Sequence, residues 1–326
     1  MKVTAAARPA MFLAFLGAAA ASTATTSLPC AHADAFTSTP YCGNPACVVL
    51  IPRDKAVSAE WMQKVALEMH LSETAFLVPR ESETESTDAA EFDLRWFTPT
   101  DEVDLCGHAT LASAHVLWEL HNFSKERRLV FHSRSGVLSA SCDDEGFIEL
   151  DFPTAPEAAV ADDDPDRARL LRAFPSLAPT DILDVGRNRI GGPGGGDVLA
   201  EVTPGAFAQL EYETSEVKKI NCRVLSVTAA GCPVAPEPGR AVEEYSFSSR
   251  GFAPCVGVDE DPVCGSAHCM LGPYWMGRLG GQETMLARVS SPRGGDVRVK
   301  LRGDRITLGG KAVITMTGTL LRTELA

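Results

Sequence analysis

The chain has 326 residues, of which 45% are hydrophobic and 22% are charged, a soluble globular composition with material for about two domains. Its 30 Lys and Arg against 43 Asp and Glu give a net charge of −13, which argues against nucleic acid or an anionic membrane as the main partner. Ten cysteines without a C-x-x-C pair indicate reduced thiols in a cytoplasmic compartment rather than a disulfide scaffold.

The first 30 residues differ in composition from the rest and are predicted to be a targeting or disordered extension. They contain one Lys, one Arg and no acidic residue, and the apolar run Met11–Ala21 is too short to span a bilayer. A signal or transit peptide, which would take the protein to an organelle or out of the cell, and a disordered tail both fit this pattern. Either way, we expect no stable membrane span and expect the fold to begin with a strand at Ala33–Phe36.

The first half of the folded region is predicted to consist mainly of short strands with two helices. Ser58–Met69 has helical spacing of apolar residues, with Ser58 as a plausible N-cap. Ala109–Leu120 is apolar nearly all round, which is typical of a buried helix. Strands are expected at residues 47–51, 74–78, 92–97, 129–131, 136–141 and 147–152.

The second half repeats this style after a predicted linker at Asp151–Arg167, which is rich in Pro, Ala and Asp. A short helix is expected at Ala168–Phe174 and another from about Ser266. The other elements are strands at residues 198–202, 224–228 and 245–252, and a C-terminal meander whose Gly-Gly and Gly-Asp pairs indicate hairpins.

A repeated motif connects the two halves. Residues 97–109 and 252–267 both begin Phe-x-Pro, carry an Asp shortly before Cys-Gly-x-Ala, and lead into an apolar stretch ending in Trp. The repeat predicts two similar lobes, each with one central helix whose N-terminus points into a shared cleft. Because free N–H groups and the helix dipole favour negative charge there, we expect the cleft to bind a small anionic carboxylate.

Several side chains near these helix starts could carry chemistry. His108 lies where a ligand would meet the first helix, and Asp261 precedes the second, where capping and function are equally compatible with its position. For Asp104, N-terminal capping is the favoured interpretation. Glu73 lies between apolar residues, and a carboxylate in an apolar cleft acts as acid and base near neutral pH, although most such Glu residues are solvated. No dinucleotide, zinc-protease or serine-hydrolase motif is present, and no Cys spacing matches a zinc site, so neither cofactor nor metal is expected.

In combination, five segments resemble the phenazine-biosynthesis-like (PhzF-like) isomerase family, a branch of the diaminopimelate-epimerase fold. They are Gly43–Ala46, Ser72–Phe76, Cys106–Ala112, Glu260–Cys269 and Ser291–Gly295, and the resemblance runs from about His32 to the C-terminus. It implies an α+β fold of two pseudo-symmetric lobes, each a mixed β-barrel-like sheet wrapped around a central helix. The expected lobes are residues 31–152, together with a C-terminal strand at about 312–326, and residues 153–311.

The resemblance also implies cofactor-independent isomerisation by proton transfer. We further expect a homodimer. Glu73 corresponds to the family's acid/base, and His108 and Asp261 to the residues that orient the substrate. Gly265 and Ser266 correspond to the substrate-carboxylate site, with Gly107 opposite them.

Two alternatives to Glu73 chemistry stay open. Epimerases and proline racemases of this fold use two thiols, one at each central helix, and Cys106 and Cys264 occupy those positions; a helix N-terminus lowers a thiol pKa, which makes a thiolate base reasonable. The segments around both Cys residues are nevertheless PhzF-like, which favours Glu73. The third hypothesis is a non-catalytic binding or interaction protein that keeps the fold.

Overall fold

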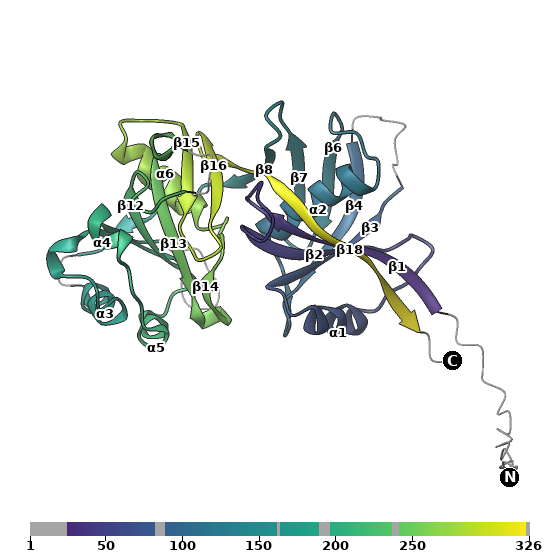
Figure 1. The fold of residues 1–326 in the computed structure, drawn as a ribbon, viewed down its shortest axis with the longest axis horizontal. Helices are drawn as coiled ribbons and strands as arrows, with labels where there is room; N and C mark the ends of the chain where they lie inside the picture. The colour runs from purple at the N-terminus through teal and green to yellow at the C-terminus, as the bar shows by residue number, and fades with distance from the viewer. Residues whose placement is uncertain (1–24, 82–88, 162–163, 189–195, 237–240, 324–326) are drawn as a thin grey trace, which may run out of the picture.

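The computed structural model describes residues 25–81, 89–161, 164–188, 196–236 and 241–323 (Figure 1). The first lobe contains β1 (Thr25–Ala35), β2 (Asn44–Leu50), α1 (Ala59–Met69), β3 (Glu73–Pro79), β4 (Ala89–Phe97), β5 (Glu102–Val103), α2 (Gly107–Leu120), β6 (Arg128–Ser133), β7 (Gly136–Cys142) and β8 (Ile148–Pro153). The second contains β9 (Ala158–Ala159), α3 (Pro165–Ala173), β10 (Ile182–Arg187), β11 (Val198–Val202), α4 (Pro204–Ala208), α5 (Thr214–Val217), β12 (Leu225–Ala230), β13 (Phe247–Ala253), β14 (Val258–Asp261), α6 (His268–Arg278), β15 (Thr284–Val289), β16 (Gly295–Arg302) and β17 (Arg305–Gly310). The final strand is β18 (Ala312–Thr323).

The order of strand pairings occurs twice, which confirms the two pseudo-symmetric lobes. In the first lobe β2 runs parallel to β3, β3 antiparallel to β4, and β4 pairs with both β5 and β6. In the second lobe β11, β12, β13, β14 and β15 pair in the same order and with the same directions. The antiparallel meanders β6–β7–β8 and β15–β16–β17 complete the two copies.

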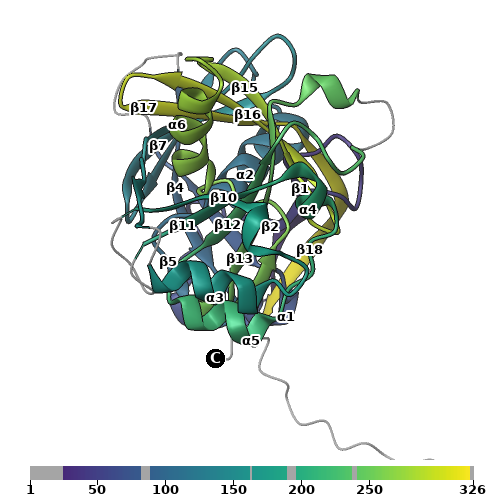
Figure 2. The ribbon, with the colours of Figure 1, turned by 90° about the vertical axis from the view of Figure 1, so that its left-hand side faces the viewer.

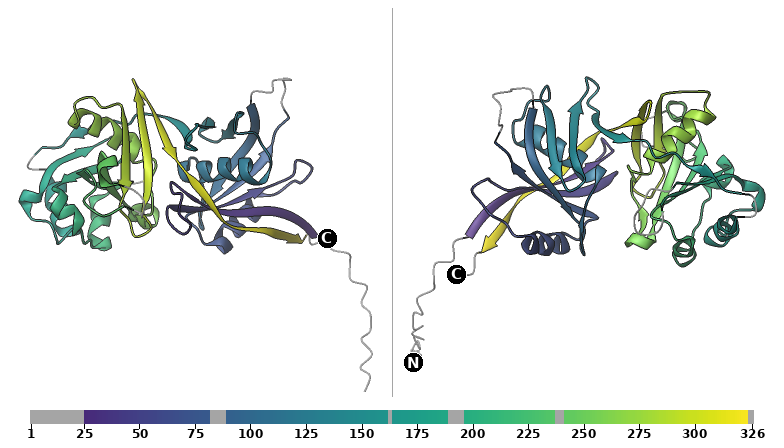
Figure 3. Two further views of the ribbon diagram at one scale, coloured as in Figure 1. Left: turned by 45° about the horizontal axis from the view of Figure 1, so that its top comes forward. Right: turned by 180° about the vertical axis from the view of Figure 1, so that it is seen from behind.

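Strands from each lobe also cross to the other. β8 and β17 pair antiparallel and join the two sheets. β8 is followed in the chain by β9, which pairs with β10 in the second lobe. β17 is followed by β18, which runs from the lobe junction back along β1, as both views in Figure 3 show. On these pairings we propose that the first lobe comprises residues 25–153 with β18, and the second lobe residues 158–310.

The central helices are buried because they have no polar face. Ten residues of α2 are buried, and the helix contacts β1, β2, β3, β8 and β18. In the second lobe α6 contacts β16 and β17, and one apolar cluster includes side chains from both central helices. The remaining helices cover outer faces: α1 packs over β1–β3 in one cluster, and α3, α4 and α5 cover the far side of the second lobe (Figure 2).

Local signals account for several element boundaries. Ser58 caps α1 as predicted, its Oγ accepting a hydrogen bond from the Trp61 N–H at 3.2 Å. Gly43 precedes β2 with φ +67°, and a Cβ there would lie 2.2 Å from the Ala35 carbonyl oxygen. Only glycine fits both the left-handed backbone and this close approach.

Two boundary predictions are wrong, and a third differs from the structure by two residues. The first strand begins at Thr25, not Ala33, because Leu28 is fully buried under α1 and the backbone of residues 25–30 pairs with β18. Residues 25–30 therefore belong to the fold, and residues 1–24 lie outside the described part. The predicted linker at 151–167 contains the end of β8, the short strand β9 and the start of α3, since its Pro residues stand at strand and helix ends. The helix expected from about Ser266 starts at His268, after a tight turn.

None of the helices in the described residues is long and apolar enough to cross a membrane.

Candidate active site

The start of β3 places Ser72 and Glu73 beside the N-terminus of α2. Glu73 Oε2 lies 3.2 Å from His108 Nε2, and Ser72 Oγ lies 3.3 Å from the same nitrogen. The other ring nitrogen, Nδ1, is 3.5 Å from Cys106 Sγ. The first half of the site is therefore a compact group of a carboxylate, an imidazole, a hydroxyl and a thiol.

The second half of the site lies at the end of β14 and in the turn before α6. Asp261 Oδ1 accepts hydrogen bonds from the Val263 N–H at 3.0 Å and from Asn44 Nδ2 at 2.8 Å. The Asn44 side chain comes from the start of β2, in the first lobe, and its Oδ1 accepts from Ser72 Oγ at 3.3 Å. A continuous set of hydrogen bonds thus connects His108, Ser72, Asn44 and Asp261 across the two lobes.

The pseudo-symmetry extends to the two Cys-Gly turns. Thr110 Oγ1 donates to the Cys106 carbonyl at 2.6 Å, and His268 Nδ1, four residues after Cys264, lies 2.9 Å from the Cys264 carbonyl. No side chain caps the first turn of α2 or of α6. The N–H groups of these turns are therefore not occupied by a capping side chain, as an anion site requires.

The glycines of the two turns have different surroundings. A Cβ on Gly265 would lie 3.3 Å from the Phe36 ring, which comes from the first lobe, whereas a Cβ on Gly107 would meet only the Phe152 ring at 3.8 Å. The Ser266 hydroxyl accepts a hydrogen bond from Arg223 Nη1 at 3.1 Å. Arg223 in turn is paired with the buried carboxylate of Asp197.

The symmetry between the lobes breaks at the start of β3. Ala46 pairs with Glu73 across β2 and β3, and the matching pair in the second lobe is Val198 with Leu225. The two thiols occupy equivalent places, but only the first lobe has a carboxylate at this strand start. An acid/base mechanism based on Glu73 would therefore use one carboxylate.

Burial determines the ionisation of the site. Desolvation raises the pKa of Glu73, although the neighbouring Ser72 hydroxyl and Cys106 thiol oppose this rise. Desolvation also raises the pKa of Asp261, and it lowers the pKa of His108 to about 4, so the imidazole is neutral at pH 7. A neutral ring fits the tautomer in which the Cys106 thiol donates to Nδ1 and the Nε2–H faces Glu73.

Both thiols stay protonated at neutral pH. Burial and the neighbouring Glu73 charge raise the pKa of Cys106 well above its usual value. Burial and Asp261 raise the pKa of Cys264 to about 12. The favourable effect of the helix N-termini on the thiolate is therefore outweighed by desolvation and by nearby carboxylates.

Glu73, Cys106 and His108 offer three metal-ligand atoms within 4.8 Å of one another. The ring presents Nε2 to the carboxylate but Nδ1 to the thiol, whereas one ion would need a single nitrogen facing both. The arrangement fits proton transfer better than metal binding.

The structure brings together Glu73, His108 and Asp261, with Gly107, Gly265, Ser266 and both thiols in the adjoining turns.

The capping prediction for Asp104 is wrong, since its side chain is 77% exposed and faces Arg134. Asp104 stands two residues before Cys106, whereas Asp261 stands three residues before Cys264. Sequence analysis missed three side chains that contact the site, Asn44, Ser72 and Arg223. The first two lie within quoted motifs, and nothing in the sequence distinguished Arg223.

Comparison with known proteins agrees with this geometry. Residues 33–318 match the family described as phenazine biosynthesis-like protein. The chain is 42% identical over 301 residues to an uncharacterised isomerase of Halalkalibacterium halodurans, covering 90% of this chain and 96% of that protein. It is 39% identical over 303 residues to the mouse phenazine biosynthesis-like domain-containing protein 2, covering 90% and 99%.

A solved structure shows the same fold. The crystal structure of a phenazine biosynthesis PhzF family protein from Enterococcus faecalis matches with a TM-score of 0.73 and 33% identity, over 90% of this chain and 99% of that one. A two-lobed fold shared with proteins named as isomerases defines the class. The chain belongs to the phenazine biosynthesis-like (PhzF) family and is an isomerase of that family.

Proposed function

We propose that this protein is a cofactor-independent isomerase that moves a proton on a small carboxylate-bearing substrate, with Glu73 as the acid and base. The observation that carries the proposal is the lack, within the described part of the chain, of a hydrogen-bond partner for one carboxylate oxygen, Glu73 Oε2. This oxygen is buried and, among the described residues, has no hydrogen-bond partner, since its contact with His108 lacks hydrogen-bond geometry. A buried acceptor without a partner is costly unless a substrate supplies one.

The proposed chemistry uses one carboxylate for two proton transfers. Ionised Glu73 takes a proton from a carbon, and the C–H electron pair spreads into the conjugated or carboxylate-bearing system. The proton on Glu73 exchanges with solvent, and the protonated carboxyl group then gives a proton to a different carbon, which leaves the enzyme unchanged. A pKa raised by burial serves both steps, since the same group must accept and donate near neutral pH.

The other residues would position the substrate. His108 and Asp261 face it from opposite lobes, and the turn N–H groups at Gly107 and at Gly265–Ser266 would hold its carboxylate. A screen of small carboxylates in deuterated water, read as carbon-bound deuterium by mass, tests this function. The proposal fails if no carboxylate acquires deuterium, and in that case a binding protein of the same fold is the better account. A cytoplasmic location and a homodimer stay predictions.

The two-thiol mechanism is the second candidate, favoured by the symmetric placement of Cys106 and Cys264. Their raised pKa values argue against it, since a thiol must ionise before it can take a proton. We therefore expect a Cys106→Ser/Cys264→Ser double variant to keep its exchange rate within about tenfold of the wild type, as expected when neither removed group is the base. A larger loss that either single variant reproduces would support a thiol base.

The ionisation of His108 gives a test that needs no substrate. We expect its ring to stay neutral down to about pH 4, because burial disfavours the imidazolium. Titration of the histidine ring signals by NMR, with His108→Gln to assign the signal, measures this directly. A midpoint near the ordinary value of 6.5 would mean that the site is more hydrated than the structure shows.

A further inference from the structure

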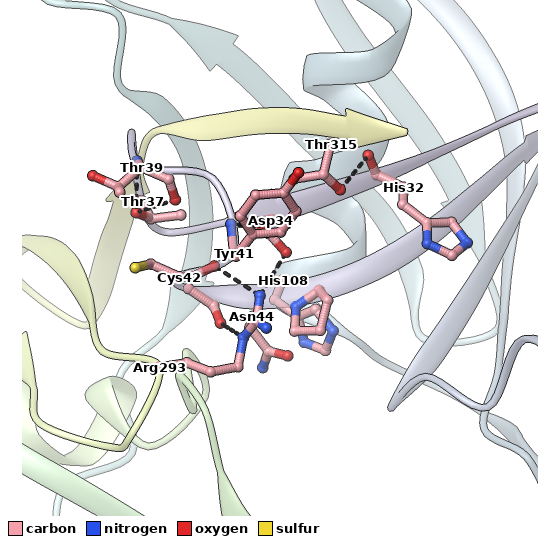
Figure 4. A network of polar contacts seen from close by, with 12 residues as sticks. His32, Asp34, Thr37, Thr39, Tyr41, Cys42, Asn44, His108, Arg293 and Thr315 are labelled. Atoms are coloured by element: carbon pink, nitrogen blue, oxygen red, sulfur yellow. Dashed lines mark hydrogen bonds and ion pairs between the residues drawn. The ribbon is translucent and has the colours of Figure 1, made fainter. Parts of the chain in front are cut away.

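Two of the family motifs, Gly43–Ala46 and Ser291–Gly295, have no assigned part in the proton transfer. They nevertheless contact each other next to the site. Arg293, in the turn between β15 and β16, reaches the first lobe (Figure 4). Its Nε donates to the Gly43 carbonyl at 2.8 Å, and its Nη2 donates to the Cys42 carbonyl at 3.0 Å. The guanidinium therefore holds the backbone immediately before Asn44.

Arg293 is itself fixed by a buried carboxylate. Asp34, at the end of β1, is 3% exposed, and its Oδ1 accepts from Arg293 Nη2 at 2.7 Å. The second oxygen, Oδ2, accepts from the Tyr41 N–H at 2.7 Å. The ion pair of Asp34 and Arg293 thus crosses between the lobes, and its two members hold residues 41–43 at the end of the loop before β2.

The backbones of the two turns interlock as well. The Gly43 N–H donates to the Gly294 carbonyl at 2.8 Å. The Gly294 N–H donates to Ser291 Oγ at 3.0 Å, and Ser291 Oγ donates to the Pro262 carbonyl at 2.6 Å, next to Asp261. Gly294 has φ +67°, and a Cβ there would collide with the Arg288 guanidinium at 2.2 Å, so the turn depends on glycine.

These contacts determine the position of the Asn44 side chain, which is fully buried. Its Nδ2 donates to Asp261 Oδ1 at 2.8 Å and to the Val263 carbonyl at 3.1 Å, while its Oδ1 accepts from Ser72 Oγ. Both amide hydrogens have acceptors, and both acceptors belong to the second lobe. Hence the Asn44 amide group can form both of these hydrogen bonds only when the two lobes are correctly placed relative to each other.

We propose that the Ser291–Gly295 turn is an inter-lobe clamp in which Arg293 is a positioning residue. Arg293 holds the backbone before Asn44, and the Asn44 side chain holds Asp261 and Ser72 in place on the two sides of the active site. This inference rests on the proposed function for its kinetic consequence. Arg293 does not touch the reacting atoms; its effect passes through Asn44. Displacing a substrate-orienting group by a fraction of an ångström is enough to slow a proton transfer greatly.

The test uses variants that avoid leaving a buried charge without its partner. Asp34→Asn/Arg293→Met removes both charges together, and Arg293→Lys keeps the charge but loses the fork that reaches two carbonyls. Ser291→Ala leaves the ion pair intact and removes the two hydrogen bonds of the Ser291 hydroxyl, one to the Pro262 carbonyl and one from the Gly294 N–H. Arg80→Met is the matched control, because Arg80 forms an exposed ion pair with Asp93 outside these turns.

The first measurement is the Asn44 side-chain amide signal in 15N NMR, assigned by Asn44→Asp. We expect two slowly exchanging hydrogens in the wild type and in Arg80→Met. In the double variant and in Arg293→Lys we expect exchange faster by at least about tenfold, the effect of losing one hydrogen bond. An Asn44 signal that is unchanged in both Arg293 variants would overturn the proposal, even if one of them is less stable.

The second measurement is kcat/KM for proton exchange on a carboxylate that the wild type accepts. We expect it to fall at least about tenfold in both Arg293 variants and in Ser291→Ala, and to be unchanged in Arg80→Met. Full activity in the Arg293 variants would contradict the clamp. If the wild type exchanges no carboxylate, the proposed function fails, and the amide signal still decides the clamp.

Discussion

Glu73→Gln is expected to lower the rate of isomerisation by about two to four decades, the usual contribution of a well-placed acid/base group. The substitution keeps the size of the side chain but leaves no group that can take a proton. The neighbours His108 and Cys106 do not replace it, since the ring is neutral with a low pKa and the thiol is protonated. Single-turnover or steady-state kinetics on an accepted carboxylate measures the loss.

The same variant is expected to be at least as stable as the wild type above pH 5. Burial raises the folded-state pKa of Glu73, so ionising it costs the wild type stability as the pH rises from the unfolded pKa to the folded one. Gln does not ionise and avoids that cost. Denaturant unfolding at several pH values checks this. A variant that is inactive and also markedly less stable would suggest that the loss of activity reflects misfolding.

Removing residues 25–30 is expected to destabilise the protein strongly, although removing residues 1–24 is predicted to leave it unchanged. Leu28 is fully buried in the apolar cluster under α1, and the backbone around it pairs with β18. Losing one buried Leu side chain costs about 2–5 kcal/mol, and the lost strand pairing adds to this. The unfolding temperature of a chain starting at Ala31 should fall by several degrees below that of a chain starting at Thr25.

A point substitution separates packing from backbone pairing in that result. Leu28→Ala should reproduce about 2–5 kcal/mol of the loss, whereas Ser27→Ala, on the exposed side of the same strand, should have little effect. Equal unfolding midpoints for the chains starting at Thr25 and at Ala31 would show that the start of β1 contributes nothing to the core.

The two-lobed architecture could be predicted because its evidence is local in the sequence. The repeated Cys-Gly-x-Ala motif marks the two helix starts, and the all-round apolar pattern of residues 109–120 indicates a buried helix, as found. The early start of β1 could not be predicted, because residues 25–30 become a strand by pairing with β18 at the other end of the chain. Such non-local pairing leaves no periodic pattern in a short segment.

The site residues likewise divide into those with a local signal in the sequence and those whose contacts arise only in the fold. Glu73, His108 and Asp261 stand in recognisable motifs, so they could be named, and the structure brings their side chains together. The role of Asn44 could not be derived, because its hydrogen bond to Asp261 spans 217 positions in the sequence. Arg293 likewise contacts Asp34 across 259 positions. A motif shows that a residue is needed, whereas only the fold shows which side chain it contacts.

The central claim is that one carboxylate, Glu73, carries the proton. Its most direct test is carbon-bound deuterium uptake by an accepted carboxylate in deuterated water, compared among wild type, Glu73→Gln and Cys106→Ser/Cys264→Ser. We predict uptake by the wild type and the double thiol variant, and a loss of at least about a hundredfold in Glu73→Gln. Uptake by Glu73→Gln within about tenfold of the wild type would contradict the account, as would its disappearance in the thiol variant alone.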